Sequence, residues 1–451
     1  MSSLSVFITA RDGGARLSAQ PAAALRPAEP GDDKLPSVML DERVAYQEME
    51  GIGGAFTEAA AVTLAKLPLA KQEEVMRAYF DPKAGHGYTL CRTHIGSCDF
   101  ALGNYSYCDE PGDHALKTFS IERDRQALLP MIRRAQAVSG NAFKLLASPW
   151  SPPAWMKTTG RMNLGGKLLP ECREAWALYY ARYIRAYAGE GVPIWALTVQ
   201  NEPEAKQTWD SCIYTGEEER DFVRDHLGPT LHREGLADVK IVVWDHNRDR
   251  LYERARIVYD DPAAARYVWG AGFHWYVTDT FDNVQRVHDA WPDKKLLFTE
   301  GCQEGGPHDG SWLTGERYAR SMIADFNRWT VGWIDWNMVL DETGGPNHVN
   351  NFCSAPILAD TRTGEVRYQS SYYYIGHFSR FVRSGARRIL SASTKDELEV
   401  VAFKNPDGSL AVVVMNRSET PVVFLLKTGA GTAPLTAPRR SIQTVVIAAG
   451  A

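Results

Sequence analysis

Two glutamates stand at points in the sequence where a carboxyl group is costly to bury. Glu202 follows the apolar run 195–199, inside the tetrapeptide QNEP, and Glu300 follows the apolar run 296–299. An ionised carboxyl removed from water is unstable unless a charge or a hydrogen bond offsets the loss of hydration. Burial also favours the protonated form, which a general acid needs near neutral pH, so the sequence predicts that burial keeps a proton on Glu202.

Aromatic side chains accompany these two carboxyls. Trp150, Tyr276 and Trp336 also stand where apolar runs end. Cleavage of a glycosidic bond uses one carboxylic acid to protonate the leaving oxygen and one carboxylate to attack the anomeric carbon, with flat apolar faces to hold the sugar. A single glutamate after a strand is more often a helix N-terminal acid or an ion-pair partner, but two of them in aromatic company favour chemistry.

Other motifs indicate less. The stretch GIGGAF (51–56) lacks the G-x-G-x-x-G spacing of a nucleotide-binding loop, so its glycines are better explained by close packing of a first strand. His94 and His274 are each as compatible with a hydrogen-bonded core histidine as with a functional one. No H-x-x-x-H or Cys/His cluster indicates a metal, and we expect no metal and no other cofactor.

The elements that must position these residues follow a repeating pattern. Short apolar runs alternate with segments of helical character, which is typical of a (β/α)8 TIM barrel, an α/β fold. The runs are 51–56, 87–95, 143–150, 194–201, 239–245, 270–276, 295–301 and 331–337. Catalytic residues of such barrels lie where strands end, so Glu202 on the fourth strand and Glu300 on the seventh are expected to face each other across the barrel mouth.

The two ends of the chain have a different pattern. After residue 379 short alternating runs follow one another, and the Asp-Gly pair at 407–408 between two of them indicates a hairpin. The first residues also contain an apolar alternating run, SVFITAR. We therefore expect an accessory antiparallel β-sandwich domain built from both chain ends, residues 1–41 plus 380–451, beside a catalytic barrel at 42–379.

Composition restricts the partners. The 451 residues carry a net charge of -5, which argues against a nucleic-acid partner, and no apolar run approaches the length of a membrane span. The seven cysteines form no CxxC pairs, and the N-terminus has no basic segment followed by an apolar one. These features predict free thiols and a cytoplasmic location. The sequence does not indicate an oligomeric state.

Eight blocks of the sequence resemble glycoside hydrolase family 30, the family of lysosomal glucosylceramidase and bacterial β-glucosidases, in the family's order. They are GIGGAFTEAA, RTHIGSCDF, LLASPWSPPAWMKTTG, TVQNEPEA, FHWY, FTEG, SWLTGERYARSMIADFNRWTVGWIDWN and GGPNHVNNFCSAPI. The resemblance extends over residues 48–380.

The resemblance implies a role for each residue at the strand ends. Glu202 matches the acid/base and Glu300 the nucleophile of a retaining mechanism. Arg92, together with His274 and Tyr276, matches the residues that orient the nucleophile and keep it ionised. The residues matched to substrate binding are Asp99, Trp150, Asn201, His274, Tyr276, Trp336 and Asn351.

The function implied is that of a retaining, exo-acting β-glycosidase, most simply a glucosylceramidase-like β-glucosidase that acts on terminal β-linked glucose-like sugars. The expected partner is therefore a carbohydrate or glycoside. Two alternatives stay open: an endo-β-1,6-glucanase of the same family and a carbohydrate-binding barrel without catalysis. Asp99 favours exo action, because a side chain that grips the far hydroxyls of a sugar blocks a continuing chain. His94, where glucosylceramidases carry proline, and the differing loop 205–215 argue against a lipid leaving group.

Overall fold

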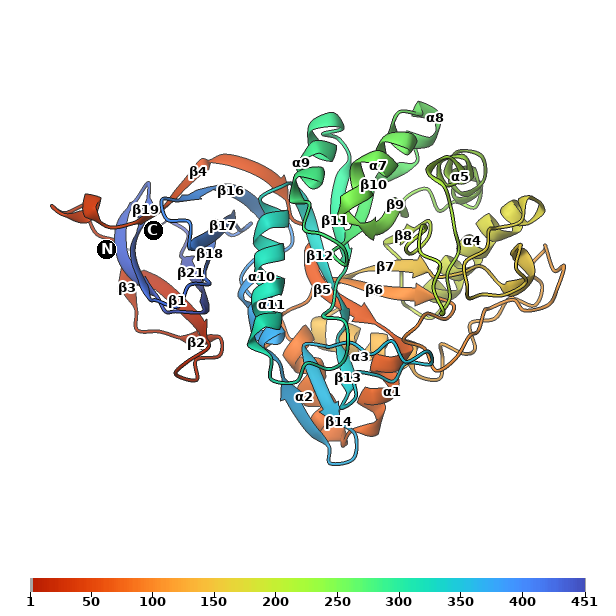
Figure 1. Cartoon of the computed structure of the whole chain (residues 1–451), viewed down its shortest axis with the longest axis horizontal. Helices are drawn as coiled ribbons and strands as arrows, with labels where there is room; N and C mark the ends of the chain where they lie inside the picture. The colour runs from red at the N-terminus through yellow and green to blue at the C-terminus, as the bar shows by residue number, and fades with distance from the viewer. Residues whose placement is uncertain (1–2, 451) are drawn as a thin grey trace.

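The computed structural model describes residues 3–450 and shows a barrel beside a separate sheet (Figure 1). In the described chain, eight parallel strands close into the barrel in the order β10, β11, β12, β5, β6, β7, β8, β9, which confirms the predicted fold. The strands are β5 (Gly51–Phe56), β6 (Leu90–Ile95), β7 (Lys144–Pro149), β8 (Ala196–Thr198), β9 (Lys240–Asn247), β10 (Val268–His274), β11 (Lys295–Glu300) and β12 (Thr330–Asn337).

Two strands differ in length from the sequence expectation, and both lead into the site. β8 is regular only over Ala196–Thr198, but the chain stays bonded to its neighbours beyond that point, since the Asn201 N–H donates to the Pro149 carbonyl at 2.9 Å. Glu202 then adopts a positive φ of 48°, which turns the chain away from the strand direction. β9 continues to Asn247, two residues past the predicted end at 245.

Helices cover the outside of the barrel because each presents one apolar face. In α4 (Arg173–Gly189), Trp176, Tyr180, Tyr183 and Tyr187 recur at helical spacing and are fully buried. The others are α1 (Glu58–Lys66), α2 (Leu69–Phe80), α3 (Leu128–Ser139), α5 (Gly216–Phe222), α6 (Gly228–Arg233), α7 (Leu251–Tyr259), α8 (Pro262–Ala265), α9 (Phe281–Ala290), α10 (Trp312–Phe326) and α11 (Ser370–Ser379). None of the helices in residues 3–450 is long and apolar enough to cross a membrane.

The interior of the barrel is a packed core below the site. Its side chains are Leu90, Leu146, Ala196, Val242, Leu297 and Ile334. A Cβ atom added at Gly53 in β5 would lie 1.9 Å from the Leu90 carbonyl oxygen, so this glycine permits the close approach of β5 to β6. The GIGGAF segment is therefore a packing feature of the first barrel strand.

The separate sheet is built from both chain ends, as predicted. Its order is β2, β1, β21, β18, β17, β16, β4, β19, β20, with β3 paired to β1. The strands are β1 (Ser3–Ala10), β2 (Ser18–Ala19), β3 (Ala23–Ala24), β4 (Ser37–Glu48), β16 (Arg387–Ser393), β17 (Leu398–Lys404), β18 (Leu410–Asn416), β19 (Val422–Thr428), β20 (Gly431–Ala437) and β21 (Ser441–Ile447). β17 and β18 form the hairpin that the Asp-Gly pair indicated.

Two details of this sheet differ from the expectation. The pairing of β4 with β19 is parallel, so the sheet is not antiparallel throughout. β4 also continues to Glu48, whereas the domain boundaries were placed at 41 and 380; residues 1, 2 and 451 lie outside the described chain. A small third sheet, β13 (Val339–Asp341), β14 (Ile357–Asp360) and β15 (Glu365–Tyr368), follows β12.

Candidate active site

A cavity with a volume of ≈ 200 Å³ opens at the carboxyl ends of the barrel strands. Eight of the ten residues predicted for the site line it: Asp99, Trp150, Asn201, Glu202, Tyr276, Glu300, Trp336 and Asn351. The other two, Arg92 and His274, are fully buried behind its wall and contact the lining carboxylates. The structure therefore brings the whole predicted set together at one place.

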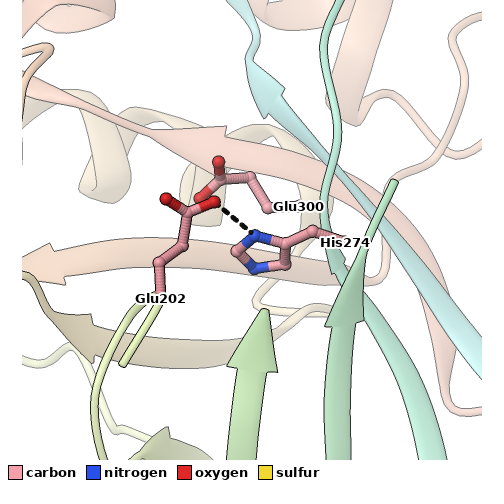
Figure 2. Close-up of side chains that lie close together, drawn as sticks. All are labelled: Glu202, His274 and Glu300. Atoms are coloured by element: carbon pink, nitrogen blue, oxygen red, sulfur yellow. Dashed lines mark hydrogen bonds and ion pairs between the residues drawn. The ribbon is translucent and has the colours of Figure 1, made fainter. Parts of the chain in front are cut away.

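The two glutamates converge from different strands, Glu202 from the end of β8 and Glu300 from the end of β11 (Figure 2). One oxygen of each carboxyl and one ring nitrogen of His274 all lie within 4.8 Å of one another. Both side chains are mostly buried, with 13% and 7% exposed. Two carboxyl groups that are this close together and this well shielded from solvent interact strongly and titrate as a pair.

Glu300 is held at both of its oxygens. Arg92 Nη1 donates to Oε2 at 2.5 Å, and the Tyr276 hydroxyl donates to Oε1 at 2.9 Å. Arg92 is itself fixed, because Nη2 donates to Asp245 at 2.8 Å and to the Asn201 side-chain oxygen at 2.9 Å. The nucleophile position is therefore set by two donors, Arg92 from β6 and Tyr276 from just beyond β10.

His274 contacts the other carboxyl. Its Nδ1 lies 3.2 Å from Glu202 Oε1 (Figure 2), and its Nε2 lies 2.9 Å from Asp245. Asp245 also accepts a hydrogen bond from the Thr299 hydroxyl at 2.6 Å. The hydrogen-bond partners of His274 are therefore Glu202 and Asp245, and it acts on Glu300 through its charge, so the predicted role in orienting the nucleophile stays a prediction.

The charges around His274 make it a cation. Burial lowers the pKa of its imidazole, but the Glu300 charge and the hydrogen bonds to Asp245 and Glu202 raise the pKa to about 9. Burial raises the pKa of Asp245, but the Arg92 charge and the His274 hydrogen bond hold it well below its usual range. Arg92, Asp245 and His274 therefore form a buried alternation of charges beneath the two glutamates.

Burial and neighbouring groups shift the pKa values of the two glutamates in opposite directions. Burial raises the pKa of Glu202, but the His246 charge and the His274 hydrogen bond bring it below its ordinary value. Burial raises the pKa of Glu300, although the His274 and Arg92 charges oppose this. His246 and His274 therefore oppose the effect of burial that was predicted to keep a proton on Glu202.

Aromatic and polar side chains form the wall for a sugar ring. The Trp150 and Trp336 rings stack with centroids 5.1 Å apart at 18°, and the Arg92 guanidinium lies 4.9 Å from the Trp150 ring. At the other end of the wall, Asn351 Nδ2 donates to Asp99 at 2.9 Å. Burial and the Glu300 charge raise the pKa of Asp99 to about 8, against the Asn351 hydrogen bond.

The side-chain NH2 group of Asn201 can donate a hydrogen bond to a substrate. Its oxygen accepts the Arg92 hydrogen bond, which leaves the NH2 group as the part that can donate. This fits the contact with a sugar 2-hydroxyl that the resemblance implies.

Three side chains of the site lie close enough together to be considered as metal ligands. Among residues 3–450, Glu202, His274 and Glu300 have ligand atoms close enough to hold an ion. A histidine binds a metal as neutral imidazole, so the proton that the raised pKa of about 9 keeps on His274 competes with a metal ion for the ring nitrogen.

His94 is a structural residue. It is fully buried outside the cavity, where Nε2 accepts the Glu58 N–H at 3.1 Å and Nδ1 lies 2.6 Å from the Gly96 carbonyl. These bonds join the start of α1 to the end of β6.

The polar end of β9 was not predicted to belong to the site. Asp245 links Arg92 to His274, and His246 and Asn247 line the cavity. The signal was present, because D-H-N follows the apolar run VVW at the end of a barrel strand. The other lining residues not predicted are Gln207, Trp209, Cys302, Glu304 and Cys353.

Comparison with known proteins agrees with this geometry. The models of the glycosyl hydrolase family 30 TIM-barrel domain and beta sandwich domain match residues 49–382 and 385–445. Mouse lysosomal acid glucosylceramidase is 37% identical over 401 residues, which cover 85% of this chain and 78% of the relative.

Solved structures are similar over nearly the whole chain. SrfJ from Salmonella typhimurium is 39% identical with a TM-score of 0.94, over 98% of this chain and 99% of SrfJ. The endo-beta1,6-glucanase BT3312 is 28% identical with a TM-score of 0.89, over 99% of both chains.

Proposed function

Since this chain belongs to glycosyl hydrolase family 30, and is thus a glycosyl hydrolase, we propose that it is a retaining, exo-acting β-glucosidase. The family membership rests on the two domain matches and on the glucosylceramidase relative. The choice among the family's activities rests on the shape of the sugar site.

The observation that carries the exo assignment is the contact between Asp99 and Asn351. Asp99 lies in the loop after β6 and Asn351 in the loop between β13 and β14, and a 2.9 Å hydrogen bond joins the two side chains in the cavity wall. A glucose unit that donates its far hydroxyls to these groups has no room for a further unit there. An endo-acting enzyme needs that end open.

In the proposed mechanism Glu300 attacks the anomeric carbon while Glu202 gives its proton to the glycosidic oxygen. The bond to the leaving group breaks and a glycosyl ester forms on Glu300. Glu202, now a carboxylate, takes a proton from water, which attacks the same carbon and frees Glu300. The Asn201 NH2 group donates to the sugar 2-hydroxyl, and this bond strengthens as positive charge develops on the ring.

Retention is supported by the spacing of the two carboxyls. Their nearest oxygens lie within 4.8 Å of each other, close to the ~5–5.5 Å separation of retaining enzymes and well below the ~6.5–9.5 Å that leaves room for an attacking water. Glu202 lies on the side of the site where the leaving group binds. The residues farther out on that side therefore determine which leaving groups the enzyme accepts.

The alternative function is that of an endo-β-1,6-glucanase. It is supported by the similarity to BT3312 and to the 27% identical Neurospora crassa Endo-1,6-beta-D-glucanase. The experiment supplies aryl β-glucosides and β-1,6-glucan and measures product length. We expect glucose alone, released from chain ends and from aryl glucosides. Early appearance of oligosaccharides from glucan, without turnover of aryl glucosides, would contradict the proposal.

A further inference from the structure

The end of β9 is distorted in a way that turns two consecutive side chains toward the site. Trp244 and Asp245 have positive φ angles of 72° and 51°, a region that non-glycine residues rarely adopt. The pairing with β10 passes from Gly272–Trp244 directly to Phe273–His246, so Asp245 is an extra residue in the ladder. Such a bulge redirects side chains that would otherwise alternate between the two faces of a strand.

As a result, Asp245 reaches Arg92 in the barrel interior while His246, its direct neighbour, lines the cavity. The His246 imidazole packs on the Trp244 indole, with ring centroids 5.0 Å apart at 38°. Trp244 is fixed in turn, because its indole N–H donates to the Asn247 carbonyl at 3.0 Å and the Arg254 guanidinium lies 4.7 Å from its ring. The position of His246 is therefore built into the strand end.

This position places a second imidazole beside the acid/base. His246 Nε2 lies 4.0 Å from Glu202 Oε1, the same oxygen that His274 Nδ1 contacts at 3.2 Å. The other His246 nitrogen, Nδ1, is buried and has no hydrogen-bond partner within residues 3–450. A proton on Nε2 points at Glu202 and avoids an unpaired buried N–H at Nδ1, so this tautomer is favoured.

We propose that His246 is a positioning residue that, with His274, holds one oxygen of the Glu202 carboxyl so that the other faces the glycosidic oxygen. The inference rests on the proposed function, in which Glu202 is the acid/base. The 4.0 Å separation is longer than a hydrogen bond, so a direct bond requires the Glu202 carboxyl to move toward His246.

The charges around His246 agree with a neutral donor. Burial lowers the pKa of His246, the Glu202 charge raises it, and the His274 cation lowers it further; Glu204 and Asp249 add weaker attraction. The balance is a lowered pKa, so near neutral pH His246 contributes an N–H without placing a second full charge beside His274.

The test uses substrates that differ in their need for a proton. We expect His246→Ala to reduce kcat/KM about tenfold for an alkyl β-glucoside, whose leaving group needs protonation, as expected for a lost hydrogen bond. For 2,4-dinitrophenyl β-glucoside, which departs unprotonated, kcat/KM should change less than about twofold. His246→Gln keeps an N–H donor and should restore most of the alkyl-glucoside activity.

A double-mutant cycle and a matched control complete the experiment. In a Glu202→Ala background, His246→Ala should have no further effect on either kcat/KM, because the residue acts through Glu202. His288→Gln removes a histidine that also stacks on a tryptophan, Trp329 at 3.7 Å, but lies outside the site, and it should leave both rates unchanged. Equal losses on both substrates, or an additive loss in the Glu202→Ala background, would overturn the inference. If the wild type cleaves neither glucoside, the proposed function fails instead.

Discussion

Replacing Arg92 with methionine removes the cation that joins the nucleophile to the rest of the site. Arg92 is fully buried and pairs with Asp245 at 2.8 Å and with Glu300 at 2.5 Å. Methionine keeps much of the side-chain volume against Trp150, so the main loss is electrostatic. Breaking a buried ion pair by removing one partner costs about 3–5 kcal/mol. Arg92 pairs with two carboxylates, but Glu300 can take up a proton when Arg92 is lost, so the cost is that of one unpaired carboxylate, Asp245. We expect the free energy of unfolding at pH 7 to fall by about 3–5 kcal/mol in Arg92→Met.

The pH dependence has a definite sign. Asp245 has a lowered pKa in the folded protein, so its contribution to stability is present above its ordinary pKa of about 4 and is lost as the pH falls toward the folded value. The stability difference between wild type and Arg92→Met should therefore be full at pH 7 and shrink below about pH 4. Loss of the cation also raises the pKa of Glu300, so the acidic limb of kcat/KM should move to higher pH.

Urea unfolding at two pH values and a pH profile of kcat/KM measure these effects. Arg248→Met is a matched control, because Arg248 is also fully buried and pairs with Asp325 at 2.7 Å but does not line the cavity. It should lose comparable stability and keep the wild-type pH profile. The reasoning is refuted if Arg92→Met loses less than about 1 kcal/mol at pH 7, or if both variants shift the acidic limb equally.

Three further predictions concern the site. Glu202→Ala should reduce kcat/KM for alkyl β-glucosides by about 10²–10⁴, while 2,4-dinitrophenyl β-glucoside gives a rapid burst of phenol before a slow steady state. Stopped-flow absorbance measures the burst, and equal losses on both substrates without a burst would contradict the role of Glu202. Asp99→Ala should lower kcat/KM for terminal glucosides about 10–100-fold through loss of hydrogen bonds to the sugar, measured with an aryl glucoside, and wild-type values would remove the argument for a closed sugar site. Dialysis against a chelator should leave activity unchanged, and a loss restored by a divalent cation would show that we overlooked a metal.

The barrel was predictable because its strands are short apolar runs with local signals. The first strand was placed at 51–56, where the structure has it, and its glycines behave as packing residues next to Leu90. Glu202 and Glu300 were found because each follows such a run and because strand ends of this fold meet at one mouth. These inferences need only local sequence and a known topology.

The electrostatics were not predictable in the same way. The lowered pKa of Glu202 depends on His246 and His274, which arrive from two other strands. The bulge that turns both Asp245 and His246 toward the site depends on pairing with β10, and no local composition marks it. The parallel pairing of β4 with β19 joins segments almost four hundred residues apart, so local sequence patterns could not predict it either. The cytoplasmic location stays a prediction.

The most direct test of the account is the identity of the residue that forms the glycosyl ester. A 2-deoxy-2-fluoro-β-glucoside with an activated leaving group slows the second step more than the first, so the ester accumulates on the nucleophile. Peptide mass spectrometry of the inactivated protein should find one fluoroglucosyl group, on Glu300 in the sequence FTEG. A label on Glu202 or on another residue, or turnover of β-glucosides with no ester formed, would contradict the assignment of the two carboxyls.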